Sequence, residues 1–234
     1  MNLNADFSRR AVVHAGAMAW VPSPMPGVER RMLDRIGDEM ARATSIVRYA
    51  PGSQFSPHTH GGGEEFMVLE GVFQDEAGDY PAGLYVRNPP ESRHTPGSAA
   101  GCVIFVKLWQ FDPADRGRVS LNTAAAPFVA AEGRPGVEMK RLFDAEGEDV
   151  RLERWAPGAA IGLDAIRGGI EILVLSGSFV EGDDHFGPWS WLRLPDGAAM
   201  RAETGSDGVV LWVKSGHLGA ADRLRDRAFL GQDG

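Results

Sequence analysis

The sequence predicts an all-β protein in which one β-rich unit is used twice. Three observations favour this fold class. The 30 glycines and 15 prolines are scattered along the 234 residues, as expected for many short strands joined by tight turns. Apolar and polar residues alternate in several short stretches, which is typical of half-buried strands. The second half of the chain also repeats the first, so one structural unit is used twice.

The repeat is clearest where YAPGS at 49–53 corresponds to WAPGA at 155–159, an offset of 106 residues. The same offset aligns Gly71 with Gly177 and Pro89 with Pro195 without a gap. We therefore expect an N-terminal domain over 1–116 and a C-terminal domain over 136–234. The intervening segment 117–135 is rich in Ala, Gly and Pro and is predicted to be a linker.

Along the first half, residues 21–27 contain three prolines and are predicted to form an extended crossing rather than regular structure. Residues 28–36 and 41–50 flank Gly37-Asp38 and are predicted to form a hairpin. The apolar run 102–111 should form a buried strand that contains Cys102. At the other end of the chain, GAADRLRDRAFL is predicted to form a short charged helix.

A candidate metal site lies in the stretch PGSQFSPHTHGGGEEFMVLEG, residues 51–71. Side chains repeat every second residue in a strand, so His58 and His60 should point to the same face. The three glycines that follow permit a tight turn that returns a carboxylate towards this pair. Histidine is the commonest nitrogen ligand of transition metals, and His94 is the natural further ligand.

The spacing of these residues reads G-x5-H-x-H-x3-E-x6-G from Gly52, followed by G-x5-P-x-E-x2-H from Gly83. These spacings resemble the two motifs of the cupin fold, a jelly-roll barrel with a metal between its sheets. The resemblance implies a bicupin, with two double-stranded β-helix (jelly-roll) barrels in one chain. The second motif is the weaker match, because Glu91 stands where glycine is usual and Ser98 where asparagine is common. Glu64 fits the ligand spacing better, and Glu65 remains the alternative.

The second copy lacks these ligands. At the offset of 106 residues, the counterparts of His58, His60, Glu64 and His94 are Asp164, Ile166, Ile170 and Met200. A transition metal needs three or four converging donors, so the second barrel should keep the fold without a metal site. We therefore expect one divalent metal per chain, and no cofactor in the second barrel.

Composition excludes some function classes. The net charge of −8 and the lack of a basic cluster argue against nucleic-acid binding. The single cysteine excludes an internal disulfide and is typical of a reducing compartment. No apolar run approaches the length of a membrane span, and the N-terminus lacks a secretory signal, so a cytoplasmic location without membrane contact is expected.

The segments HTHGGGEEFMVLEG, GDYPAG, YVRNPP, HTPGS and GCVIFVKLWQFDPADR resemble the ChrR-like cupin family. The family is named for the zinc-binding cupin domain of a bacterial anti-sigma factor. The resemblance implies that His58, His60, Glu64 and His94 are the metal ligands. The family's anti-sigma proteins begin with a helical domain that carries a His/Cys zinc motif. This chain has one cysteine, so we do not expect it to inhibit a sigma factor.

Three functions compete. The first is a mononuclear metal-dependent dioxygenase of small diketone-like or anionic substrates, because the family name is also similar to that of iron cupins that cleave β-diketones. The second is a non-enzymatic metal-dependent sensor or small-molecule-binding module, and the third is a structural protein stiffened by its metal. Three histidines and one glutamate leave two open positions on six-coordinate Fe(II), Mn or Ni, whereas they fill tetrahedral Zn. The second barrel is expected to support assembly as a homodimer.

Overall fold

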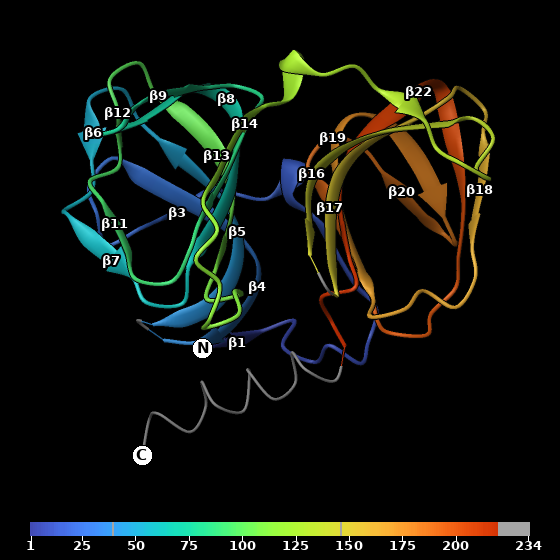
Figure 1. Ribbon diagram of the computed structural model, residues 1–234, viewed down its shortest axis with the longest axis horizontal. Coiled ribbons are helices and arrows are strands. Elements are labelled where there is room, and N and C mark those ends of the chain that lie inside the picture. The colour runs from blue at the N-terminus through green and yellow to red at the C-terminus, as the bar shows by residue number, and fades with distance from the viewer. Residues whose placement is uncertain (39, 146, 220–234) are drawn as a thin grey trace. The chain divides into compact units, whose positions relative to one another are not determined.

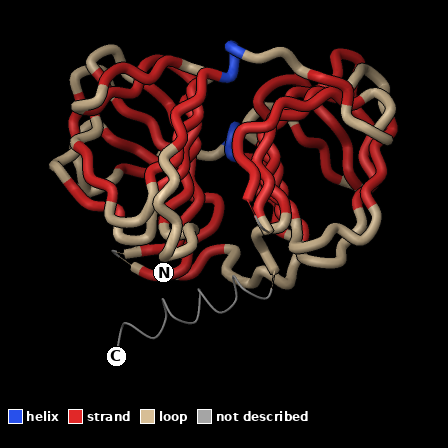
Figure 2. The backbone as a smooth tube through the Cα atoms, viewed as in Figure 1, coloured by secondary structure: helices blue, strands red, loops and turns tan. Residues whose placement is uncertain are grey.

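The computed structural model describes residues 1–219 except for residues 39 and 146. The chain divides into two compact units, the first formed by Met1–Ala5 and Met18–Ala125. The second unit is formed by Asp6–Ala17 and by the chain from Ala126 onward. Strands dominate the described residues, with short 3-10 helices at Ala15–Ala17 (η1) and Thr123–Ala125 (η2) (Figure 2). The all-β prediction is thus confirmed, whereas the predicted C-terminal helix lies outside the described residues.

The first unit contains a curled antiparallel sheet with the strand order β1-β4-β5-β13-β8-β10-β14 (Figure 1). The strands β7 and β11 form a separate two-stranded sheet at one side of this unit. The strands of this unit are β1 (Asn2–Leu3), β3 (Val21–Pro22), β4 (Val28–Gly37), β5 (Ala41–Tyr49), β6 (Ser53–Gln54), β7 (His58–His60), β8 (Glu64–Asp75), β9 (Gly78–Pro81), β10 (Leu84–Asn88), β11 (Ser92–His94), β12 (Gly97–Ser98), β13 (Cys102–Leu108) and β14 (Val119–Asn122).

The second unit repeats this arrangement with the strand order β15-β16-β17-β22-β19-β21-β2. Its strands are β2 (Ala11–His14), β15 (Val129–Ala130), β16 (Val137–Ala145), β17 (Glu148–Trp155), β18 (Ala160–Leu163), β19 (Ile170–Glu181), β20 (Asp184–Phe186), β21 (Ser190–Leu194) and β22 (Met200–Ser215). The internal repeat of the sequence is therefore a repeat of structure.

The predicted first hairpin is confirmed as β4 and β5, which pair from Val28 opposite Tyr49 to Gly37 opposite Ala41. Gly37 has a φ of 100°, a backbone conformation that favours glycine and lets the chain reverse. The proline-rich segment before the hairpin was expected to lack regular structure. Its first two residues instead pair with β4 as β3, because Pro22 lies on a sheet edge where its missing N–H costs no ladder bond.

One strand from each half of the sequence pairs in the unit formed mainly by the other half. β2 lies near the start of the chain, yet it pairs with β21 of the second unit. β14 lies at the corresponding place in the second repeat and pairs with β10 of the first unit. The segment 117–135, predicted to be a linker, consequently contains β14, η2 and β15.

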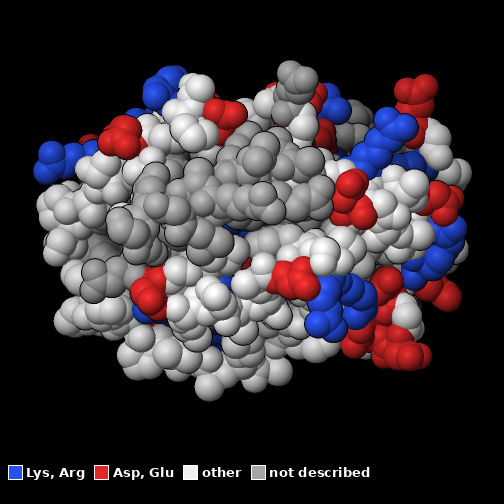
Figure 3. All heavy atoms as spheres, turned by 90° about the horizontal axis from the view of Figure 1, so that it is seen from below, with Lys and Arg blue, Asp and Glu red and all other residues white. Residues whose placement is uncertain are grey.

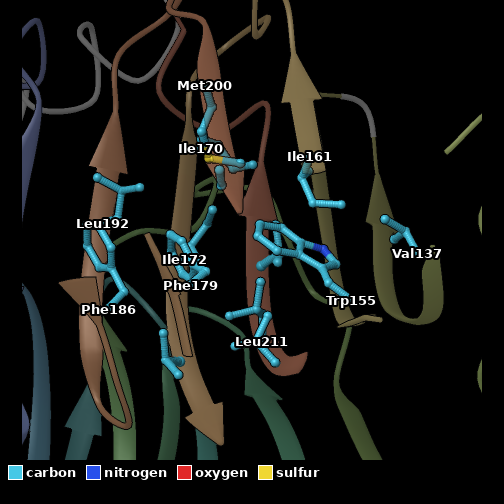
Figure 4. Close-up of a cluster of buried hydrophobic side chains, with 14 of the residues drawn as sticks. Val137, Trp155, Ile161, Ile170, Ile172, Phe179, Phe186, Leu192, Met200 and Leu211 are labelled. Carbon is cyan, nitrogen blue, oxygen red and sulfur yellow. The ribbon is translucent and has the colours of Figure 1, made fainter. Parts of the chain in front are cut away.

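Each unit has its own hydrophobic core. In the first unit the buried side chains include Phe66, Phe73 and Ile104. Cys102 belongs to the same core, and burial raises the pKa of its thiol to about 11, which disfavours the reactive thiolate. The second core contains Trp155, Phe179 and Phe186 among others (Figure 4).

Among the residues that the structure describes, no helix has the length and hydropathy needed to cross a membrane. On the face shown in Figure 3, acidic and basic side chains are interspersed and do not form a field of one sign. A field of positive charge is the usual sign of a nucleic-acid-binding surface, and this face does not carry one.

Candidate metal centre

Three histidines of the first unit converge through the pairing of β7 with β11. The register places His58 directly opposite His94, and His60 follows on the same face of β7 two residues later. The ligand atoms of the three side chains all lie within 4.8 Å of one another. The Nε2 atoms of His60 and His94 are 2.8 Å apart, so both imidazoles face one point.

The glycine turn after β7 brings β8 to the same place. The N–H of Gly63 donates to the carbonyl of His60, and Gly63 has a φ of 76°. A side chain at Gly62 or Gly63 would collide with Trp109 or Phe111, because their atoms lie 2.4 and 2.6 Å from the position of an added Cβ. Glycine is therefore required here by both conformation and space.

Glu64 begins β8 on the histidine side. Its Oε2 lies 3.5 Å from Nε2 of His60 and 3.6 Å from Nε2 of His94. The side-chain amide of Asn88 donates a hydrogen bond of 3.1 Å to the same oxygen and orients the carboxylate. Glu64 thus places a carboxylate oxygen beside two of the three histidines.

Glu65 points to the opposite face of β8, as neighbouring residues in a strand must. It is buried and accepts a hydrogen bond of 2.6 Å from the hydroxyl of Tyr85. Nη1 of Arg87 lies 3.6 Å from its other oxygen. Glu65 therefore belongs to a buried structural network, and the geometry favours Glu64 as the ligand.

Oxygen atoms at Nδ1 orient two of the histidines, His58 and His94, on the side away from the cluster. Nδ1 of His58 lies 2.9 Å from the carbonyl oxygen of Ser56, and Nδ1 of His94 lies 3.3 Å from Oδ2 of Asp75. Protonated Nδ1 atoms donating to these oxygens leave each Nε2 with a free lone pair, which is the form that binds metal. Asp75 in turn accepts a hydrogen bond of 3.0 Å from Tyr80.

Electrostatics also favour neutral imidazole at this site. Burial, together with the adjacent His58, lowers the pKa of His60 to about 4. Burial raises the pKa of Glu64, while His94, Asn88 and His58 oppose that shift. The lowered pKa keeps His60 neutral, so its lone pair can bind a cation without the prior loss of a proton.

The cluster opens onto a cavity of about 680 Å³. His58, His60 and Glu64 lie on its wall, and apolar side chains such as Val47, Ile104 and Val106 form much of the remainder. Arg30 and Arg35 of β4 also line the cavity. A cavity of this size and character suits a small organic molecule with a few polar groups.

Comparison with protein-family models gave a match to the ChrR cupin-like domain, which covers residues 8–112 and again 116–219. The chain belongs to this family. No curated protein matched the chain significantly. The two matched segments show that the protein is a bicupin in which each cupin repeat begins with the strand that pairs in the other unit.

Several solved structures share the cupin fold. A candidate dioxygenase from Nostoc punctiforme has a TM-score of 0.72 and 16% identity, with 92% of this chain and 85% of that chain covered. The Escherichia coli pirin YhhW in complex with nickel(II) has a TM-score of 0.63 and 16% identity, with 89% and 99% covered. Bacillus subtilis oxalate decarboxylase, which has Mn(II) centres, has a TM-score of 0.60 and 12% identity, with 88% and 77% covered. These likenesses show the fold.

In the second cupin repeat, apolar side chains replace the cluster. Ile166, Ile170 and Met200 are buried in its hydrophobic core, and Figure 4 shows the latter two there. The ungapped alignment needs one correction, because Leu163 rather than Asp164 lies opposite Met200 as His58 lies opposite His94. Asp164 is exposed and pairs with Arg201.

Two arginines flank the ligand motifs in sequence and also occur in the second repeat, which predicts a structural role for both. Arg48 stacks on Trp20 and pairs with Glu29, just as Arg154 stacks on Phe128 and pairs with Glu138. Arg48 and the second of the two arginines, Arg87, do not line the cavity beside the histidines.

The second arginine, Arg87, is buried and lies 3.3 Å from Asp115, shortly before β14. Its counterpart Arg193 lies over the ring of Phe7 and donates to the carbonyl of Asp6, shortly before β2. Arg87 thus contacts the segment that leads into β14, and Arg193 contacts the segment that leads into β2.

Sequence reasoning missed or misplaced three further residues. Asp75 carries no motif signal, since it reaches His94 only through the length of β8. Glu91 is exposed and has a φ of 68°, a backbone conformation that the sequence did not reveal and that explains why glycine is usual at this position. His217 belongs to no motif, yet it is buried with Nε2 3.2 Å from Oε1 of Glu171.

Proposed function

We propose that the first cupin repeat binds one divalent metal through His58, His60, Glu64 and His94. We further propose that the protein is a mononuclear metal-dependent oxygenase of small diketone-like or anionic substrates. The observation that carries this proposal is the histidine cluster beside Glu64, with His58, His60 and Glu64 on the wall of an otherwise largely apolar cavity. A metal held there is open to a small molecule rather than sealed inside the core.

The donor set fits a metal in its chemistry. Nδ1 of His58 and of His94 each face an oxygen acceptor, which directs both Nε2 atoms to the cluster. Imidazole nitrogen and carboxylate oxygen suit Fe(II), Mn(II), Ni(II) and Zn(II), and four donors leave two positions on a six-coordinate ion. The nickel(II) of the E. coli pirin and the Mn(II) centres of the oxalate decarboxylase support the proposal of a divalent metal.

A bound metal would act as a Lewis acid that polarises the oxygens of a chelating substrate and gives access to O2 chemistry. The protein's own residues have other tasks. Asp75 holds His94 in the required tautomer, and Asn88 holds the carboxylate of Glu64 in place. The apolar side chains of the cavity exclude water, which strengthens every charge interaction inside it.

The test is to load metal-free protein with Fe(II) under anaerobic conditions, add acetylacetone and then air, and follow O2 uptake. The proposal expects uptake that depends on both substrate and protein, with His94→Ala as the matched control. Uptake no greater than in that variant, across a small panel of diketones and hydroxy acids, would overturn the oxygenase reaction. A metal-dependent sensor or binding module would then be the better description.

Two further properties belong to this proposal. The reduced, buried Cys102 is compatible with a cytoplasmic location. The second repeat, with an apolar core in place of the metal cluster, leaves that unit free to serve assembly as a homodimer. Light scattering at micromolar concentration tests the dimer, and a monomer there would exclude it.

A further inference from the structure

Among the described residues that line the cavity, Arg30 has a buried side-chain nitrogen without a hydrogen-bond partner. Arg30 lies on β4 between Val21 of β3 and Val47 of β5. Its Nε is buried and has no hydrogen-bond partner, and none of the ion pairs among the described residues includes its guanidinium. A buried donor without an acceptor costs free energy, so the position calls for an acceptor that the described chain does not supply.

The second repeat shows what the fold itself needs at this position. Met139 occupies the equivalent register, because it lies between Val129 of β15 and Glu153 of β17. Its side chain packs against the core of the second unit. The strand and its neighbours therefore form equally well with an apolar side chain, and the guanidinium appears in the repeat that holds the histidines.

The neighbouring cation does not fill the same role. Arg35 lines the same cavity, but its Nε and Nη2 donate to the carbonyl oxygens of Gly37 and Asp38. Burial, with a smaller contribution from Arg30, lowers the pKa of Arg35. An anion beside Arg30 would relieve this repulsion between the two cations.

We propose that Arg30 binds the carboxylate of a small ligand whose other end carries the oxygens that reach the metal centre. The inference rests on the proposed function and narrows its substrate class to diketone-like molecules with a terminal anionic group. Arginine suits this task because its planar fork of N–H groups matches a carboxylate. The apolar wall between the guanidinium and the histidines would accommodate the carbon chain that joins the two ends.

The test compares two ligands that differ in one group. Succinylacetone ends in a carboxylate where butyrylacetone ends in a methyl group, and both carry the same diketone. Binding of each is measured by calorimetry under anaerobic conditions with Mn(II)-loaded protein, and metal content is measured in parallel. Wild-type protein should bind succinylacetone at least about tenfold more tightly, the effect of one charge-assisted pair in a partly desolvated site.

The variant Arg30→Met introduces the residue that the second repeat carries at this register. This variant should reduce the preference for succinylacetone over butyrylacetone to less than about twofold. The affinity for butyrylacetone and the metal content should stay unchanged. The variant Arg48→Met removes the same charge from a side chain outside the cavity and should keep the full preference.

Three results would overturn the proposal: no preference in the wild-type protein, including no binding of either ligand; a preference that survives Arg30→Met; or an equal loss in Arg48→Met. Failure of the oxygenase reaction is distinguishable from these results. The binding comparison is anaerobic, so a protein that never consumes O2 would still show the preference and its dependence on Arg30.

Discussion

Asp75 at the end of β8 lies 3.3 Å from Nδ1 of His94 on β11, so a carboxylate supports the histidine from the side away from the cluster. A carboxylate behind a ligating histidine fixes the tautomer and raises the basicity of the other nitrogen. Because Asp75 is nineteen positions from His94 in sequence, the pair depends on the fold of the first repeat.

This relationship predicts a loss of metal affinity without loss of a ligand. Asp75→Asn should weaken metal binding by about 10- to 100-fold, the usual effect of removing such a partner. Competition with a chromogenic chelator measures the affinity. Asp79→Asn is the matched control, since Asp79 is exposed and bonds to Gln74 instead. An unchanged affinity in Asp75→Asn would show that the carboxylate does not support the ligand.

The second prediction concerns metal content. The protein should bind one divalent metal per chain, and changing His58 and His60 together to alanine should empty the site. The chain should remain folded, because each unit has its own hydrophobic core. Elemental analysis and circular dichroism measure the two properties. Two ions per chain, or one ion retained by the double variant, would contradict the assignment.

The adjacent glutamates allow a comparison of ligand with structural support. Glu64→Gln should weaken metal binding and leave the metal-free fold nearly as stable. Glu65→Gln should instead lower the free energy of unfolding by about 3 kcal/mol, because it breaks a buried ion pair with Arg87 and alters the bond from Tyr85. Metal titration and denaturant unfolding separate the two effects. The reverse pattern would make Glu65 the ligand.

The low pKa of His60 predicts an acid-sensitive metal-free protein. In the folded state His60 stays neutral down to about pH 4, whereas an unfolded histidine takes up its proton near 6.5. The unfolded state binds more protons between these values, so the free energy of unfolding should fall as pH drops from 6.5 to 4. A shift of this size corresponds to about 3 kcal/mol.

Glu64 acts in the opposite direction. Its raised pKa means that the folded state binds the extra proton, so its contribution is full at low pH and is lost as pH rises through the folded value. The variant His60→Gln removes the group with the lowered pKa. In urea unfolding it should therefore lose less stability on acidification than the wild type. An identical pH profile would place the acid sensitivity elsewhere.

Much of the candidate site follows from local rules of strand geometry. The two-residue period places His58 beside His60, and the glycine turn returns the chain to Glu64. Spacing favoured Glu64 but left Glu65 open, because adjacent residues in a strand differ only in the face they present. That choice needs the register of β8 against β10, which places Glu65 opposite Arg87.

Other features depend on contacts that no local pattern encodes. The partner of His217 is Glu171 on β19, so its burial follows from tertiary packing rather than from its own neighbours in sequence. Arg30 resembles any charged strand residue until the cavity behind it is known. The pairing of β2 with β21 was hidden for the same reason, since a strand of four residues carries little signal of its partner.

The pairing of β2 with β21 and of β14 with β10 bears on how such a chain could have arisen. A protein made of one repeat alone would lack the strand that lies beside β10 or β21, and it would leave that sheet edge open. Two separate copies could each supply the missing strand to the other, which is domain swapping between identical subunits. The present chain is then the covalent form of a swapped dimer. Joining the copies freed them to diverge, so that one could keep the histidines while the other exchanged them for Ile and Met.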